Sequence, residues 1–432
     1  MRKNLLTLAL LCVFAAANGQ SEQTPAYSMT LQECLQFALK NNYSRQSTAL
    51  DTKSKELDYD QSKQERLPNL SATVSENLSH TNGQSASFGG SYGISTGVTL
   101  YNGGSVNNTI EQSKLQSQQA YFQLAQYDNE LAIQIIETFL SALGNQDLLK
   151  YQRAVLKSSE EQVRRGSVLY ENGSILESDK LMFDAQYATD LNNITNTEIA
   201  LANNLRSLKS LLSLDPLTEF SIIAPDTTAL IQMGMIPSQD YVLERGLETM
   251  PELAISDYNV DIAKTALNIS KSGFYPTVSL SGSLGTGHTK FDNFGDQLSD
   301  RFNQQIGLSV NIPIFSKGRN KTQLAQSKIS LQQAELSKMQ TELNIRQTLM
   351  QEYQDLIAAQ SQYEAAATSE NAYRKSYAAS YAQFEEGMMT PVELLQQQNN
   401  YISAMNNFIQ SKYTFFLRRK VLDVYMGFEV KM

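Results

Sequence analysis

Residues 88–100 read FGGSYGISTGVTL, and this stretch decides the fold. Its even-numbered positions are mainly apolar or aromatic, whereas its odd-numbered positions are glycine, serine or threonine. Because successive side chains of a β-strand point to opposite faces, this period of two predicts a strand with one apolar face and one small, polar face. Residues 70–78 alternate in the same way, as do residues 277–284 and 305–314 in the second half of the chain.

The four predicted strands form two hairpins, over residues 68–101 and 276–315. Strands of about 10–13 residues, at about 3.3 Å per residue, cross a bilayer core when they are tilted. A face of glycine and serine would pack poorly in the dry core of a soluble sandwich, but it suits a water-filled barrel with lipid outside. Since four strands cannot close around a lumen, we expect several chains to share one barrel.

The sequence contains an internal repeat. The segment Leu100–Ser105 (LYNGGS) answers Ile314–Arg319 (IFSKGR), 214 residues later, and Tyr170–Gly173 answers Phe384–Gly387 at the same spacing. Earlier in each half, Pro68 answers Pro276, 208 residues later. The second half therefore carries six extra residues between its proline and its glycine marker. A constant spacing over long tracts, broken once, predicts an internal duplication.

The remainder of each half is predicted to be long helix. The helical runs cover residues 105–168, 174–214, 319–383 and 391–424, rich in Gln, Asn, Ser and Ala with only narrow apolar seams. At 1.5 Å per residue, the first run is about 95 Å long. Such helices suit coiled-coil packing around a wet interior. A soluble antiparallel bundle or fibrous coiled coil would also fit them, but it would not explain the interrupting strand hairpins.

These patterns divide the chain into five parts. Residues 1–19 are predicted to be a secretory signal peptide, because Arg2 and Lys3 precede a short apolar run that ends in small residues. The other parts are a first repeat at 20–214 with its helical turn near 173, a linker or equatorial segment at 215–245, a second repeat at 246–424 with its turn near 387, and a C-terminal segment at 425–432.

Composition excludes several function classes. The net charge is −9, and it becomes −11 without Arg2 and Lys3, so a nucleic-acid partner is not expected. Removal of the signal peptide leaves Cys34 as the only cysteine, in a helical pattern typical of core packing. His80 and His288 lie in polar, turn-rich stretches, where we expect them to be exposed. With no cluster at metal-ligand spacing, we expect no cofactor and no enzymatic activity, and a periplasmic hydrolase is the disfavoured alternative.

The two helix breaks are predicted to be the ends farthest from the strands. Gly173 and Gly387 each follow a long helical run, as expected of a helix C-terminus. Apolar residues follow both glycines, namely Ile175 and Leu176 in the first turn and Met388 and Met389 in the second. An apolar turn at an exposed tip indicates a docking surface, although these side chains could instead close the turn itself.

The chain resembles the TolC-like outer-membrane efflux proteins. The segment MTLQECLQFALKNN at 29–42 looks like the first helix of that family, the prolines at 68 and 276 like its strand entries, and residues 173–179 and 387–393 like its tip turns. The resemblance implies a mostly α fold with β: a homotrimer that shares a twelve-strand barrel in outer-membrane lipid and extends an α-helical barrel into the periplasm. It also implies a belt near residues 218–223 and the C-terminal segment.

The same resemblance implies partners and a gate. The tip would meet a periplasmic adaptor (membrane fusion) protein coupled to an inner-membrane transporter. The alternative function for the chain itself is that of a soluble periplasmic coiled-coil adaptor or scaffold. In the family, polar links close the periplasmic gate, here at Tyr170, Asp179, Phe384, Glu393 and Gln396. Asp179 matches the family's acid, but Phe384 lacks the hydroxyl of its partner and Gln396 replaces another acid. Met389 stands where some relatives carry arginine. We therefore expect a gate that packing closes more than salt bridges do.

Overall fold

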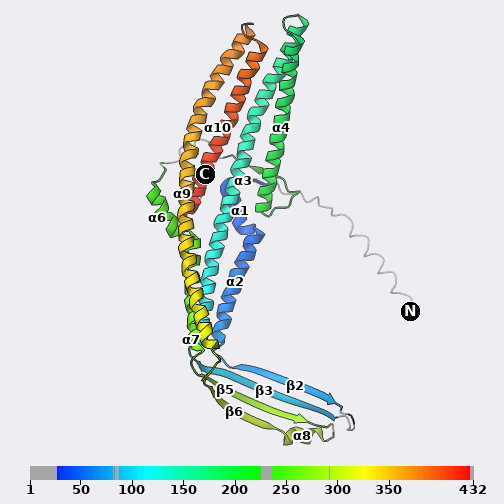
Figure 1. Ribbon diagram of the computed structural model, residues 1–432. Helices are drawn as coiled ribbons and strands as arrows, with labels where there is room; N and C mark the ends of the chain where they lie inside the picture. The colour runs from blue at the N-terminus through cyan, green and yellow to red at the C-terminus, as the bar shows by residue number, and fades with distance from the viewer. Residues whose placement is uncertain (1–26, 81, 83–86, 225–235, 291, 429–432) are drawn as a thin grey trace, which may run out of the picture.

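The computed structural model describes residues 27–80, 82, 87–224, 236–290 and 292–428. The predicted signal peptide, the middle of the predicted linker (225–235) and the end of the predicted C-terminal segment (429–432) lie outside the described residues. The molecule is elongated, with long helices above and one four-stranded sheet that bends away at the lower end (Figure 1). Among the described residues, no helix is both long and apolar enough to cross a membrane.

The elements follow one another in the same order in each half, except that the second half has an additional short helix before its last strand. The first half contains β1 (Tyr27–Met29), α1 (Leu31–Asn41), α2 (Tyr43–Gln64), β2 (Asn69–Ser79), β3 (Ser87–Asn102), α3 (Ser105–Glu171) and α4 (Glu177–Leu211). The second contains β4 (Phe220–Ile222), α6 (Gln239–Thr249), α7 (Pro251–Ser272), β5 (Thr277–His288), α8 (Phe294–Asp300), β6 (Asn303–Asn311), α9 (Arg319–Glu385) and α10 (Pro391–Tyr425).

Equal helix lengths express the duplication in three dimensions. α1 and α6 have 11 residues each, α2 and α7 have 22, α3 and α9 have 67, and α4 and α10 have 35. Since α6 corresponds to α1, the second repeat begins near Gln239, seven residues earlier than the predicted boundary at 246. The predicted linker ends too late because α6 is short and polar, so its sequence resembles that of a connecting segment.

The sheet has the order β2-β3-β5-β6, with all pairs antiparallel. The register places Ile94 beside Leu284 and Val98 beside Leu280, so apolar side chains share one face. A bulge between Thr99 and Tyr101 then puts Tyr101, and not Leu100, opposite Val278. The alternation that was predicted as far as Leu100 therefore ends in this bulge, where Leu100 has no register partner on β5. β5 runs on to His288, and α8 follows before β6 begins at Asn303.

The helices form one layer. In the half next to the sheet, the contacts run α2–α3–α7–α9; in the far half, they run α4–α3–α10–α9 (Figure 1). Of the described helices, only α3 and α9 extend through both halves; α3 packs against α2, α7, α4 and α10, and α9 packs against α7 and α10. Among the described helices, α2 and α4 form one edge of the layer and α9 forms the other, with α6 packed against the middle of α9.

A small belt surrounds the middle of the layer. β1 pairs in parallel with β4, at the position where a belt was expected, and α1 packs beside them on α3. Together with α10, these elements enclose the largest apolar cluster, which includes Phe139, Phe416 and Cys34. Cys34 is fully buried, as the sequence predicts, and burial raises the pKa of its thiol to about 12. The largest packed apolar core therefore lies halfway along the elongated molecule.

The junction between sheet and helices generates a prediction. Gly103 and Gly104 both have positive φ, so alanine at either position should cost about 1 kcal/mol in backbone strain. A Cβ on Gly103 would also lie 2.7 Å from Tyr275 Cβ and 2.8 Å from the Ser272 carbonyl oxygen, whereas on Gly104 it would meet only Asn108 Nδ2, at 3.8 Å. Gly103→Ala should therefore destabilise by about 1–3 kcal/mol more than Gly104→Ala. Thermal unfolding followed by circular dichroism would measure both, and equal losses would contradict the close approach.

Candidate functional site

The two helical turns at the far end have matching geometry. Gly173 (φ 69°) and Gly387 (φ 72°) take the left-handed conformation that ends α3 and α9. The next amides, of Ser174 and Met388, donate 2.8 and 2.9 Å hydrogen bonds to the carbonyls of Leu169 and Gln383. These bonds satisfy helix-end carbonyls, which explains why both turns require glycine. At the predicted tip, each long helix therefore ends at its glycine, Gly173 or Gly387, and the chain turns back.

The four apolar turn residues divide into two pairs. Ile175 and Met389 occupy equivalent positions and pack against the apolar cluster beneath the tip. Leu176 and Met388 are 71% and 72% exposed. Only Leu176 and Met388 therefore present an apolar surface, while the other two close the turns in the way that the alternative interpretation expected.

Two of the predicted gate acids cap helices within the chain. The Glu393 carboxylate accepts hydrogen bonds from the Thr390 amide at 3.0 Å and from the Thr390 hydroxyl at 2.8 Å. The backbone bond first, and then the hydroxyl, lower the pKa of Glu393. Asp179 occupies the same position in α4 and accepts from the Leu176 amide at 3.4 Å. Both acids stabilise helix N-termini, where negative charge is favoured.

The other predicted gate residues lie in different surroundings. Phe384 is buried and meets Phe183 of α4 edge-on, with ring centroids 6.0 Å apart. Together with Leu394 and Leu395, these rings form the apolar cluster that joins the two helical hairpins beneath the tip. Tyr170 and Gln396 are exposed. Asp179 and Phe384 thus serve separate contacts here, one as a cap and the other as core.

An ion pair crosses between the hairpins beside this cluster. Arg165 of α3 donates to the Glu385 carboxylate and to the Glu385 carbonyl, both at 2.9 Å. The Arg165 guanidinium also lies 5.6 Å from the centre of the Phe384 ring. A surface ion pair contributes little alone, but bidentate geometry over an aromatic ring fixes one arrangement of the two helices.

A buried polar layer lies deeper, below the apolar cluster. Ser159 of α3 is its centre: its hydroxyl donates to the Asp190 carboxylate of α4 at 2.5 Å and accepts from the Gln398 amide of α10 at 3.0 Å. Tyr377 of α9 accepts a bond from Gln162 of α3 at 3.2 Å. One layer therefore ties all four helices together. Burial raises the pKa of Asp190, and hydrogen bonds from Ser159 and Gln186 only partly oppose this.

The amino-acid sequence alone does not single out this layer. Ser159 and Gln162 lie three residues apart and so share a helix face, but serine and glutamine are common throughout these helices. The signal that could have revealed them is their position inside an apolar seam. Only the packing of α3 against α10 and α4 distinguishes these two residues from the exposed polar ones.

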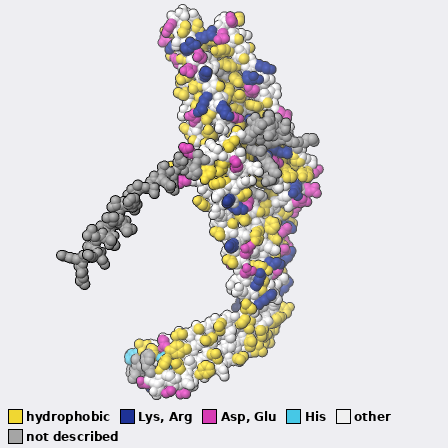
Figure 2. Space-filling view, turned by 180° about the vertical axis from the view of Figure 1, so that it is seen from behind, with side chains coloured by type: hydrophobic (Ala, Val, Ile, Leu, Met, Phe, Trp, Pro, Cys, Tyr) yellow, Lys and Arg dark blue, Asp and Glu magenta, His cyan; other side chains and the backbone are white. Residues whose placement is uncertain are grey.

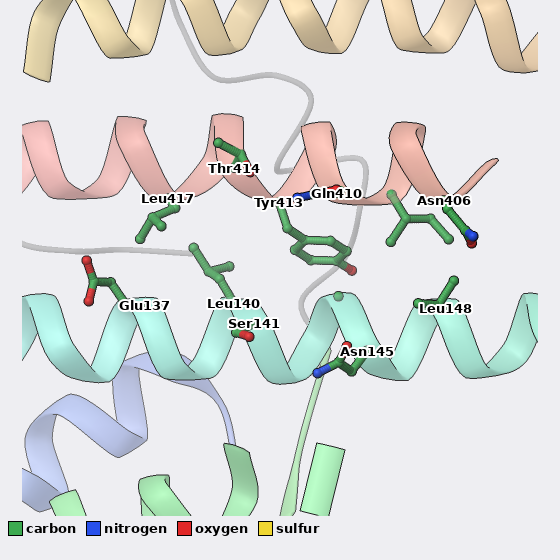
Figure 3. A pocket seen from close by; sticks show the side chains of 12 residues that line it. Glu137, Leu140, Ser141, Asn145, Leu148, Asn406, Gln410, Tyr413, Thr414 and Leu417 are labelled. Carbon is green, nitrogen blue, oxygen red and sulfur yellow. The ribbon is translucent and has the colours of Figure 1, made fainter. Parts of the chain in front are cut away.

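An open groove of about 500 Å³ lies between α3 and α10. Figure 3 shows the Tyr413 ring lying between these helices, with Leu140 and Leu417 on one side and Asn145 and Leu148 on the other. Gly144 leaves space for that ring, and the Tyr413 hydroxyl donates to Asp147 at 2.5 Å. The groove is a packing feature that brings no nucleophile and base together.

Two further features bear on catalysis. His288 was expected to be exposed, but it is 2% exposed and lies 3.2 Å from a Glu76 carboxylate oxygen, because α8 folds back over the end of the sheet. Residues 89–93 match the Gly-x-Ser-x-Gly spacing of hydrolases, yet Ser91 lies within β3 instead of at a strand-to-helix turn. Over the described ranges, no group of three His, Cys, Asp or Glu residues could hold a metal ion.

The raised pKa of Asp190 makes the stability of the fold depend on pH. Because the folded pKa of Asp190 is raised, its contribution to stability is complete below the unfolded value, near 4, and is lost as the pH rises through the folded pKa. Asp190→Asn should therefore stabilise the protein relative to wild type by an amount that increases with pH. The control Asp184→Asn removes an acid that pairs with Lys180 on the surface of α4. Melting temperatures at pH 4 to 8 test this, and a difference that shrinks with pH would contradict it.

The comparisons with known proteins agree with this architecture. The family described as "Outer membrane efflux protein" matches residues 34–213 and 242–427, which is one match in each repeat. The outer membrane efflux protein BepC of Brucella suis is 23% identical over 95% of this chain and 87% of its own length. The outer membrane protein TolC of Vibrio cholerae is 21% identical over 72% of this chain and 70% of its own length.

Solved structures share the fold. The CmeC outer membrane channel of Campylobacter jejuni superposes with a TM-score of 0.77 at 18% identity, covering 92% of this chain and 85% of CmeC. The predicted fold class, two repeats of a strand hairpin and a long helical hairpin, is thereby confirmed. Since the family profile spans both repeats, the chain belongs to the outer membrane efflux protein family and is a protein of the outer membrane with a helical extension into the periplasm.

Proposed function

We propose that three copies of this chain form an exit duct through the outer membrane, which couples at its tip to a periplasmic adaptor and an inner-membrane transporter. One observation carries the proposal: the sheet has an apolar face that nothing in the described chain covers. Its aliphatic side chains are between 38% and 86% exposed: Leu70, Val74, Leu78, Ile94, Leu280, Leu284, Ile306, Leu308 and Val310. A continuous apolar face of this kind indicates contact with lipid.

Aromatic side chains border this apolar face at both ends. Tyr101, Tyr275 and Phe315 are exposed at the helix end, and Phe302 is exposed at the loop end. Such rings concentrate where membrane meets water. The opposite face carries small polar residues, with Ser71 and Ser95 hydrogen-bonded across β2 and β3. This face suits a water-filled lumen, and the proposed role requires no catalysis.

Among the described residues, the edge strands β2 and β6 each pair on one side only, so backbone groups along their outer sides lack strand partners. Pairing β6 of one copy with β2 of the next satisfies these groups and leaves no open edge. Three copies, with four strands each, then form a barrel of twelve strands. The alternating small and apolar faces would become the lumen and the lipid surface of one barrel.

The helical layer offers complementary edges for the same assembly. On α2, Tyr43, Leu50 and Leu57 recur every seven residues, and on α9 so do Ile329, Leu336 and Leu343; all six are between 49% and 73% exposed. α2 ends at the sheet and α9 begins there, so the two helices of neighbouring copies are antiparallel. Matched by distance from the sheet, Leu57 meets Ile329, Leu50 meets Leu336 and Tyr43 meets Leu343. Heptad stripes of this kind pack as a seam.

The seam predicts which residues can be cross-linked between copies. In a Cys34→Ala background, a chain carrying Leu50→Cys and Leu336→Cys should form covalent trimers on oxidation, and these should give discrete conductance steps in a planar bilayer. The control pair Leu50→Cys and Ile357→Cys lies on the same stripes but about 30 Å out of register, and it should not cross-link. A protein that stays monomeric and never conducts would exclude the duct and favour the soluble periplasmic adaptor or scaffold.

The tip has two proposed roles that fall on different residues. Exposed Leu176 and Met388 provide an apolar surface for the adaptor, because desolvated apolar anchors dominate such contacts. Buried Phe384, against Phe183, holds the hairpins together and closes the gate by packing. Asp179, which caps its own helix, has no share in this closure.

Substitutions at the tip should separate these roles. Phe384→Ala removes a buried ring, at a cost of about 3–5 kcal/mol, and should raise the open probability of single channels. Asp179→Ala should leave the open probability unchanged. The double substitution Leu176→Glu and Met388→Glu should keep wild-type conductance but abolish transport in cells. Opening caused by Asp179→Ala would show that a polar link, and not packing, holds the gate.

A further inference from the structure

Cations gather where the helical layer meets the sheet. Arg66 lies three residues before β2, Lys271 six residues before β5, and Lys317 six residues after β6. Arg319 and Lys321 follow at the start of α9. All five side chains are exposed. Figure 2 shows Lys and Arg side chains at the lower end of the helical part, just above the bend, with the sheet below it mainly hydrophobic or uncharged. We call these five residues the basic collar.

Several other cations of the helical layer are neutralised by neighbouring acids. Lys55, Lys63, Lys114 and Lys264 each pair with an acid three residues away. Within the described part of the chain, no collar residue forms an ion pair with an acid; Arg66 donates instead to the Asn107 side chain, and Lys271 to that of Asn268. The collar charge is therefore available to an external anion, in a chain whose net charge is −9.

Exposed apolar side chains alternate with the collar. Leu67 follows Arg66, Phe274 and Tyr275 follow Lys271, and Phe315 precedes Lys317; all four apolar side chains are exposed. Long cationic side chains beside apolar and aromatic ones suit the boundary of a bilayer, where the stems contact lipid chains and the charged ends reach the head groups.

The other end of the sheet has the opposite charge. Glu76 is the only charged residue within the four strands, and it lies near the loop end. Asp292, Asp296 and Asp300 follow in and around α8, against Lys290 and Arg301. The positive surface is thus confined to the helix end of the sheet, so it is not a general property of the chain.

One collar residue has an unusual backbone. Lys317 takes a left-handed conformation, φ 50°, at the position that Gly103 occupies in the first repeat. A lysine is strained there and a glycine is not. The second repeat therefore places a long cation at the junction in spite of the backbone strain, which is the kind of outlier that points to a function.

We propose that the basic collar binds the phosphodiester head groups of anionic glycerophospholipids in the leaflet next to the helices. The proposal rests on the proposed membrane function and adds a lipid class to it. Each collar side chain can donate hydrogen bonds to phosphate oxygens, and arginine does so with two parallel bonds. Three copies would carry fifteen such cations around one barrel, so the preference should weaken as salt screens the charges.

The test uses the full-length trimer reconstituted in nanodiscs of phosphatidylcholine, with or without phosphatidylglycerol. The collar variant is Arg66→Gln with Lys317→Gln and Arg319→Gln. The control is Lys40→Gln with Lys157→Gln and Lys375→Gln, which removes three exposed cations far from the sheet. We expect phosphatidylglycerol to raise the melting temperature of wild type and control by several degrees, and that of the collar variant by less than half as much. Lipid counting by native mass spectrometry should follow the same order.

Each outcome has a definite meaning. An equal response of all three proteins to phosphatidylglycerol overturns the collar. If inorganic phosphate in detergent stabilises wild type as much as the lipid does, the surface binds free phosphate and the proposal also fails. A protein that inserts into neutral phosphatidylcholine without any preference for anionic lipid refutes the collar alone. Failure to insert into either lipid refutes the duct itself.

Discussion

The structure depends on one constraint: the sheet exposes an apolar face and two unpaired edges that a single chain cannot cover. Backbone groups at an open edge must find partners, and in lipid no water can supply them. In the proposed assembly, lipid covers the apolar face, and neighbouring copies of the chain pair with the two edges. The heptad stripes on α2 and α9 follow from the same condition, because helices that continue a closed sheet must themselves close.

Local patterns were sufficient to predict most of the fold. Alternation located the strands, glycine at a left-handed position located both tips, and the repeat spacing matched helices of equal length. Contacts between distant segments were not predictable in this way. The bulge after Thr99, the repeat boundary at α6 and the burial of His288 each depend on a neighbour far along the chain. The polar layer around Ser159 was missed because exposed and buried serines look alike in sequence.

Duplication explains why the candidate site is only partly symmetric. The two repeats keep their glycines and their capping acids, Asp179 and Glu393, since helix ends impose the same needs in both. Between those points they have diverged, so that Tyr170 is exposed while its counterpart Phe384 is core. With the same backbone geometry but different side chains, Phe384 packs against Phe183 of the other hairpin, whereas Tyr170 stays exposed.

The continuity of α3 and α9 has a mechanical consequence. Each runs for 67 residues, about 100 Å, without a proline. A long helix without proline tends to bend only gently. α3 and α9 therefore act as stiff struts, while the shorter α4 and α10 end at the middle. A torque applied at the far end would travel along these two struts to the rim of the sheet, so each copy would turn as a single lever rather than flex.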